Sequence, residues 1–358
     1  MADPVATHVA ATPVGLSRRR LLASAISAAC AAPFSRPVLA AGRTSLTSTV
    51  IGGTFQKIYD ETVVKPFEAG NNVDVALNIG SPNEWLASAI MNRASPELDV
   101  LLLTYPESIR AVKAGICQEL KAAELPNLAD VYPQFWDGFN RQGVAIDFIS
   151  FGLMNRTDSK LPKPVSWNDL FKPEYNSKIA VPTLSISGGV QFLVTLAQLN
   201  GGGVDNIEPG FDAVKRLKPN IMRFYTSKSE GQQIVERGTA AVVMGEHNVA
   251  ATLIDDGIPI EFVTPSEGVM IGSVSLHVVK NSSNAEAAKK FVNFAISSQV
   301  NGAFNTRLIA GATNEKVVLK PEIAARIPTY KQLLFPDWSK IVDRLPDWLD
   351  RWNREIVS

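Results

Sequence analysis

The feature that most constrains the fold is an alternation of short apolar segments with amphipathic ones. Strands are predicted at residues 50–53, 73–77 and 99–103, helices at 55–69 and 84–91, and a further helix opening at Pro106. The segment 99–103 is apolar on both faces, which is typical of a parallel strand covered by helices on both sides. This order of elements predicts an α/β fold.

A second alternating run lies between two extended segments, 144–154 and 269–279. Its strands are expected at 179–181, 221–225, 240–244 and 260–263, and its helices at 189–199, 210–217, 230–237 and 248–254. The two extended segments would carry the chain out of a first lobe and back into it, so that the second run forms a lobe inserted into the first.

The predicted architecture is therefore a two-lobed α/β fold, each lobe a mostly parallel sheet flanked by helices, with a ligand cleft between the lobes. Residues 41–150 and 270–358 would form lobe 1, and residues 151–269 would form lobe 2. The C-terminal helices of lobe 1 are expected to cross between the lobes. Trp348 and Trp352 lie four residues apart on one face of a predicted helix, which favours packing across the domains over an exposed platform for ligand.

The first 40 residues resemble an export signal rather than part of this fold. Three arginines at 18–20 precede an apolar run at 21–32, and Val-Leu-Ala at 38–40 offers a small-residue cleavage site. The run is shorter than the ~20 residues that span a bilayer. The arginines beside a serine resemble a twin-arginine signal, so we expect residues 1–40 to be a twin-arginine-type signal peptide of a periplasmic protein. Lipidation of Cys30 is the alternative.

Composition excludes some classes of function. Without its first 40 residues the chain keeps 318 of its 358 residues, with 31 basic and 34 acidic side chains and a net charge of −3. This balance argues against a nucleic-acid-binding protein, which needs a basic face to displace counterions. Cys117 is then the one remaining cysteine, so no internal disulfide is expected, and its apolar neighbours predict a small buried side chain.

Several short motifs occur in a characteristic order. They are Gly-Gly-Thr-Phe at 52–55, Ser-Pro-Asn-Glu at 81–84, Pro-Val-Ser-Trp-Asn-Asp-Leu-Phe at 164–171 and Pro-Ser-Glu-Gly at 265–268, and matching segments run from about residue 50 to residue 336. Together they resemble the extracellular solute-binding proteins of ABC transporters, of the spermidine/putrescine-binding type. The resemblance implies a type II-like periplasmic binding protein that closes two lobes around one solute by hinge motion.

The resemblance also implies the partners and the site. The expected partners are a small-molecule solute and the membrane permease of an ABC importer, with no nucleic acid, no cofactor, no metal and no catalytic residue, in a monomer. Candidate ligand residues follow strand ends or match the family's motifs. They are Gly53, Thr54, Phe55, Asn83, Glu84, Tyr105, Ser185, Ser187, Tyr225, Glu246, Gly272 and Ser273.

Several of these residues have an equally reasonable structural role. Gly53 could simply start a helix, Asn83 could cap one, and the turn at 185–189 could be a capping loop as well as an anion cradle. Tyr105 could be a packed aromatic at a helix start. His247, next to Glu246, is expected to be a structural histidine rather than a ligand.

One departure from the family pattern bears on the solute. Polyamine receptors resemble one another in an acidic residue shortly after Pro-x-Glu-Gly, which pairs with an ammonium group, whereas this chain has Val-Met-Ile-Gly-Ser at 269–273. An uncompensated ammonium is costly to bury, which argues against a diamine and favours a small organic acid or amino acid. Putrescine or spermidine stays the alternative, because Glu84 and Glu246 could supply negative charge.

Other classes of protein are less well supported. Gly-x-Ser-x-Gly, His-Glu-x-x-His and Gly-x-x-x-x-Gly-Lys-Ser/Thr do not occur, which argues against the usual exported hydrolases, metalloproteases and P-loop enzymes. Ferric-ion receptors of related fold resemble one another in a pair of adjacent tyrosines, and no such pair occurs in this chain. We therefore expect a receptor and not an enzyme.

Overall fold

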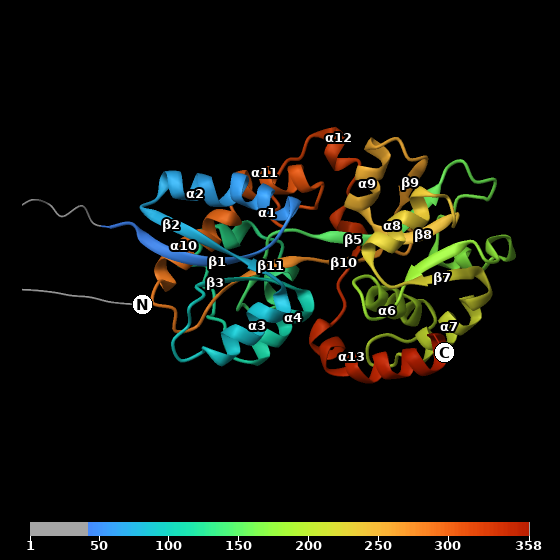
Figure 1. The fold of residues 1–358 in the computed structure, drawn as a ribbon, viewed down its shortest axis with the longest axis horizontal. Helices are drawn as coiled ribbons and strands as arrows, with labels where there is room; N and C mark the ends of the chain where they lie inside the picture. The colour runs from blue at the N-terminus through green and yellow to red at the C-terminus, as the bar shows by residue number, and fades with distance from the viewer. Residues whose placement is uncertain (1–41, 358) are drawn as a thin grey trace, which may run out of the picture. The chain divides into compact units, whose positions relative to one another are not determined.

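Two mixed sheets, each covered by helices, make up the fold in this computed structural model, which describes residues 42–357 (Figure 1). The predicted signal peptide, its cleavage site and Cys30 lie outside the described residues. Within the described range, no helix combines the length and the apolar character needed to cross a membrane.

The first sheet has the strand order β2-β1-β3-β11-β4. Its strands are β1 (Thr44–Ile51), β2 (Val73–Gly80), β3 (Val100–Thr104), β4 (Val144–Ala145) and β11 (Val274–Val278). β1 pairs in parallel with β2 and β3, whereas β11 runs antiparallel to β3 and β4. The first four residues of β3 have no exposed surface, as their apolar sequence predicts.

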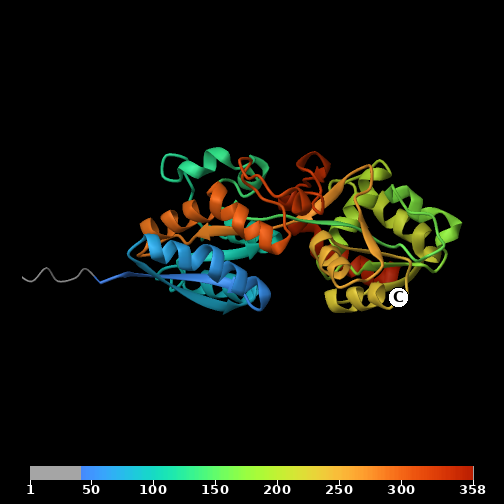
Figure 2. The same ribbon diagram turned by 90° about the horizontal axis from the view of Figure 1, so that it is seen from above.

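Helices cover both faces of the first sheet. One face carries α1 (Thr54–Tyr59), a π-helical segment (Asp60–Val64), α2 (Lys65–Gly70), α10 (Ala285–Ala295) and α11 (Ser298–Leu308), and the other carries α3 (Pro82–Met91) and α4 (Tyr105–Lys113). Figure 2 shows α10 and α11 in orange beside the blue helices. Phe67 and Phe291 meet edge to face there with ring centroids 5.1 Å apart, so helices from the two ends of the chain share one core.

The second sheet has the order β12-β10-β5-β8-β6-β7, and β9 also pairs with β5. Its strands are β5 (Ile149–Arg156), β6 (Ile179–Pro182), β7 (Ile221–Tyr225), β8 (Val242–Glu246), β9 (Ile260–Val263), β10 (Val269–Gly272) and β12 (Leu333–Leu334). Its principal helices are α6 (Gly189–Leu199) and α7 (Glu208–Leu217) in one core cluster, and α8 (Lys228–Glu236) and α9 (His247–Asp255) in another.

Shorter elements connect these layers. They are α5 (Gln134–Asp137), α12 (Pro321–Ala324), the 3₁₀ turns Pro126–Asp130, Trp167–Phe171, Pro173–Tyr175, Lys218–Asn220 and Tyr330–Gln332, and a C-terminal π-helical turn (Asn353–Val357). Cys117 is buried as expected, and burial raises the pKa of its thiol to about 12.

The chain passes from the first sheet to the second between β4 and β5, and returns between β10 and β11. These are the two extended segments that the sequence predicts. Every antiparallel pairing involves β5, β10 or β11, while the pairings among β1, β2 and β3 and among β6, β7 and β8 are parallel. The sheets are thus more mixed than expected, because strands that leave and re-enter a sheet reverse direction. Lobe boundaries at residues 150 and 270 stay a prediction.

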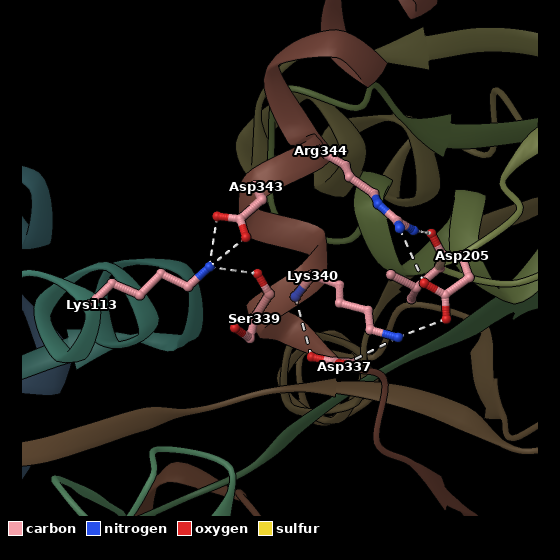
Figure 3. Close-up of polar contacts among 8 residues, drawn as sticks. Lys113, Asp205, Asp337, Ser339, Lys340, Asp343 and Arg344 are labelled. Atoms are coloured by element: carbon pink, nitrogen blue, oxygen red, sulfur yellow. Dashed lines mark hydrogen bonds and ion pairs between the residues drawn. The ribbon is translucent and has the colours of Figure 1, made fainter.

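Helix α13 (Trp338–Trp352) contacts elements of both sheets (Figure 3). Lys113 of α4 donates to the Asp343 carboxylate at 2.6 Å, while Lys340 pairs with Asp205, just before α7, at 2.7 Å and Arg344 pairs with the same carboxylate at 3.1 Å. These groups are largely exposed, so their ion pairs contribute little to stability.

Two tryptophans anchor α13 more firmly than its ion pairs do. The Trp338 ring stacks on Tyr105, with centroids 5.4 Å apart. Trp352 is fully buried, packs edge to face on Phe224, and donates from Nε1 to Thr183 Oγ1 at 3.1 Å. Both ends of the helix are therefore fixed by aromatic packing.

We predict that Trp352→Ala lowers the free energy of unfolding by about 3–5 kcal/mol, because it leaves a large cavity and an unpaired Thr183 hydroxyl. Asp205→Asn should leave this free energy almost unchanged. Urea unfolding followed by circular dichroism measures both. Equal effects of the two substitutions would contradict the dominance of packing over ion pairs.

Candidate functional site

A cavity of about 740 Å³ lies where residues from both sheets meet the strands that connect them. Thr54 and Tyr105 reach it from helix starts on the first sheet, and Ser185 and Glu246 reach it from the second. Ser273, between β10 and β11, lines it from the crossing itself. The volume falls in the range of small-molecule sites.

The structure brings together eight of the twelve residues selected from the sequence. The eight that line the cavity are Thr54, Phe55, Tyr105, Ser185, Ser187, Glu246, Gly272 and Ser273. They come from five separate stretches of chain, most of them where a strand gives way to a helix, which is where crevices open in α/β sheets. Whether they bind ligand stays a prediction.

The other four residues lie outside the cavity lining. Gly53, at φ 77°, precedes α1 and sets its start. Ser81, not Asn83, is the N-cap of α3, and the Glu84 carboxylate accepts the Ser81 N–H at 3.0 Å. Asn83 instead accepts a hydrogen bond from Arg110 on an exposed surface.

Tyr225 is also engaged elsewhere. Its residue is 6% exposed, and its hydroxyl donates to the carbonyl of Met244 at 2.7 Å. Burial raises the pKa of this phenol, with a further contribution from the Glu246 charge. The side chain therefore ties β7 to β8 below the cavity wall. The sequence correctly placed Tyr225 at the carboxyl end of a strand, but it did not predict the direction of the side chain.

Asp147 is the buried carboxylate among the cavity residues that sequence reasoning missed. It lies between β4 and β5, is 1% exposed, and accepts the N–H of Val274 on Oδ1 at 2.7 Å. Burial raises its pKa to about 7, an effect opposed by the Val274 N–H and increased by the charge of Glu246. A signal was present, because Asp147 is the one charged residue in the predicted crossing 144–154.

Glu246 and Lys228 form an ion pair at the cavity wall. The Lys228 ammonium lies 2.5 Å from Glu246 Oε1, with the carboxylate side chain 8% exposed and the lysine side chain 61% exposed. Lys228 begins α8, and Ser227 caps this helix by accepting the Glu230 N–H. The charge that Glu246 brings to the cavity wall is thus already partly compensated.

The turn before α6 is shaped by its glycines. Gly188 has φ 96°, and a Cβ on Gly189 would lie 2.1 Å from the Thr183 carbonyl oxygen. The Gln191 side chain accepts the Gly188 N–H at 3.0 Å. With the turn satisfied internally, Ser185 and Ser187 are left to line the cavity.

Both histidines of the described chain are buried and held by hydrogen bonds. Ser150 N–H donates to Nδ1 of His247 at 3.0 Å, and Nδ1–H of His277 donates to the Gln142 carbonyl at 2.8 Å. Burial lowers the pKa of each imidazole to about 4, so both stay neutral at physiological pH. Neither lines the cavity.

Metal-binding side chains do not cluster in residues 42–357: no three His, Cys, Asp or Glu side chains converge there in a way that could hold an ion. What the cavity offers instead is hydroxyls, carboxylates and apolar walls, including Phe55, Ile149 and Phe151. Such a lining can bind and orient a small amphipathic solute.

Comparison with known proteins agrees with this geometry. A family model described as bacterial extracellular solute-binding protein matches residues 99–344. The spermidine/putrescine-binding periplasmic protein of Salmonella typhimurium is 24% identical over 75% of this chain and 80% of its own length. The gamma-aminobutyric acid-binding protein of Pseudomonas aeruginosa is 22% identical over 80% of this chain and 82% of its own length.

A solved structure shares the fold. The crystal structure of an ABC transporter from Clostridium perfringens superimposes with a TM-score of 0.78 at 24% sequence identity, covering 87% of this chain and 99% of that one. The two-sheet α/β architecture is therefore an established fold.

We predict that Asp147→Asn stabilises the ligand-free protein at pH 8 by up to about 4 kcal/mol and at pH 5 by less than half as much. The carboxyl holds its proton more tightly when folded, with a pKa of about 7 against an ordinary 3.8, so the wild-type free energy of unfolding falls as pH rises from about 4 to 7. Urea unfolding at both pH values measures the difference. A stabilisation independent of pH would contradict the buried ionisation.

For Tyr225→Phe we expect a loss of about 1 kcal/mol in the free energy of unfolding, because the Met244 carbonyl loses its donor. The affinity for any solute that stabilises the chain should stay unchanged. Calorimetric titration alongside thermal unfolding tests this, and a tenfold weaker affinity would show that the hydroxyl reaches the solute after all.

Proposed function

The chain belongs to the bacterial extracellular solute-binding protein family, and on this premise we propose that it is the periplasmic receptor of an ABC importer that binds one small polar solute. The observation that carries the proposal is the cavity of about 740 Å³, lined from both sheets and floored by the strands that join them. A solute held there contacts both sides at once, so binding stabilises a closed arrangement over an open one. The membrane permease recognises the closed form and receives the solute.

The lining supports binding rather than chemistry. The two buried histidines are neutral and do not line the cavity, and Cys117, four residues after α4, is buried with a raised pKa and does not line it either. The cavity therefore lacks an activated nucleophile from either residue type. We propose that the protein carries out no reaction, works as a monomer and binds no nucleic acid.

We propose that export brings the chain to this site of action. Residues 1–40 would be a twin-arginine-type signal removed after Ala40, with lipidation at Cys30 as the alternative. The mature chain would then close residues 41–150 and 270–358 as one lobe against residues 151–269 as the other.

The solute class follows from the polar groups of the cavity. Small donors at Gly272 and Ser273 suit an organic acid or the carboxylate of an amino acid. The carboxylates of Asp147 and Glu246 favour a second candidate, a polyamine or another amine. The relatives that bind spermidine, putrescine and gamma-aminobutyric acid support an amine-containing solute.

A thermal-shift screen of the purified protein against amino acids, organic acids and polyamines tests the receptor function. We expect one class to raise the melting temperature, since a ligand at 100 times its Kd stabilises the folded state by about 2.7 kcal/mol. X-ray scattering should show a smaller radius of gyration in the complex, and mass spectrometry should recover the solute unchanged. No stabilising solute, or conversion of one, would contradict the proposal.

A further inference from the structure

Asp147 lies between β4 and β5, where the chain first passes from one sheet to the other. One of its carboxylate oxygens accepts the N–H of Val274 at 2.7 Å, and Val274 directly follows Ser273 at the return crossing. This hydrogen bond joins the outgoing and the returning crossing, as does the one from the Ile146 N–H to the Val274 carbonyl at 3.0 Å. The same carboxylate lines the cavity.

The other charges around the cavity do not neutralise Asp147. In the part of the chain that the structure describes, Asp147 makes no ion pair, because Lys228 lies 2.5 Å from Glu246 and Arg307 lies 2.5 Å from Glu61. Glu107, the third carboxylate of the lining, hydrogen-bonds with the Thr104 hydroxyl. An ionised Asp147 therefore has no ion-pair partner among the described residues, and a cationic solute would supply one.

Two further polar atoms of the cavity lining lack a partner. Ser273 Oγ and Asn248 Oδ1 are buried and make no hydrogen bond with any residue the structure describes, and the Ser273 residue is 7% exposed. Both atoms can accept a hydrogen bond. With the Asp147 carboxylate, they give the cavity three acceptors that call for donors from a solute.

We propose that Asp147 sets the charge specificity of the receptor by binding a protonated primary amine, with Ser273 and Asn248 as further acceptors. An ammonium group carries three donors and one positive charge, which matches these groups. Phe55, Ile149 and Phe151 line the same cavity and suit a short alkyl body. This inference rests on the proposed receptor function and names the class of its solute.

A rival arrangement predicts the opposite pH dependence. Protonated Asp147 could donate a hydrogen bond to the carboxylate of an organic acid, and the affinity for that acid would then fall as pH rises. An ammonium group binds the ionised form of Asp147, so its affinity increases as pH rises. Burial raises the pKa of Asp147 to about 7, with Glu246 and Lys228 acting on it in opposite directions. Glu107 and Arg307 also line the cavity, and His247 stays neutral above about pH 4.

Calorimetric titration of the full protein with matched probes tests the proposal. The amines are 4-aminobutyrate and putrescine, and the controls are 4-hydroxybutyrate and 1,4-butanediol, in which hydroxyls replace the amino groups, together with succinate. We expect one amine to bind at least 100-fold more tightly than its hydroxyl control, with an affinity that increases from pH 5.5 to 8.5.

Variants separate recognition from stability. Asp147→Asn should weaken amine binding at least 100-fold and remove its pH dependence, while melting at or above the wild-type temperature. Asp99→Asn is the matched control, because Asp99 is a buried carboxylate that accepts the Thr47 N–H and does not line the cavity. That variant should melt lower and bind the amine as the wild type does.

The outcomes distinguish this inference from the receptor function. Unchanged amine affinity in Asp147→Asn, or binding of succinate that weakens with rising pH while no amine binds, overturns the inference and leaves a receptor. If the thermal-shift screen finds that the solute has no ammonium group, the inference is likewise overturned while the receptor function stands. If that screen yields a different amine, the same variants are titrated with it. If no solute stabilises the protein, the receptor function itself is overturned.

Discussion

The antiparallel pair formed by β5 and β10 is the constraint on which the site depends. Ile149 lies opposite Gly272 and Ser150 opposite Ile271, and the same register brings Asp147 opposite Val274. The backbone N–H and C=O groups of two strands that leave a sheet need hydrogen-bond partners, and here the two strands bond to each other. The pairing fixes both crossings side by side and thereby builds the floor of the cavity from residues more than 120 positions apart in the sequence.

A buried carboxylate at the floor of the cavity lowers the stability of the protein without a solute, and by the inference above it contributes to binding when a solute is present. Its ionisation is opposed by burial, and the cations near the cavity are already engaged with Glu246 and Glu61. Stability and binding therefore make opposite demands on one side chain, a common property of functional sites. The rest of the fold compensates through apolar packing, for example at Trp352 and at the phenylalanines shared by α2 and α10.

Local patterns predicted most of the helices and strands. The apolar run at 99–103, the helix at 189–199 and the crossing segments are close to the elements observed. Side-chain direction was harder to predict. Tyr225 and Glu246 each end a strand of the second sheet. The Tyr225 hydroxyl bonds β8, two strands away, whereas the Glu246 side chain lines the cavity. The cap of α3 lies at Ser81, whose backbone N–H donates to the Glu84 carboxylate, an arrangement that the Ser-Pro-Asn-Glu segment permits but does not require.

The sequence by itself determined the class of fold, the family and the strand ends at which a site could form, because hydrophobic periodicity and motif order are local properties. Tertiary structure alone decided which of those ends meet at one cavity and what charge they present. The absence of an acidic residue at 269–273 suggested a site without a carboxylate there, yet the register of β5 on β10 brings Asp147 to the same place. The net charge of a site is the sum of the charges on several chain segments, and only folding brings those segments together.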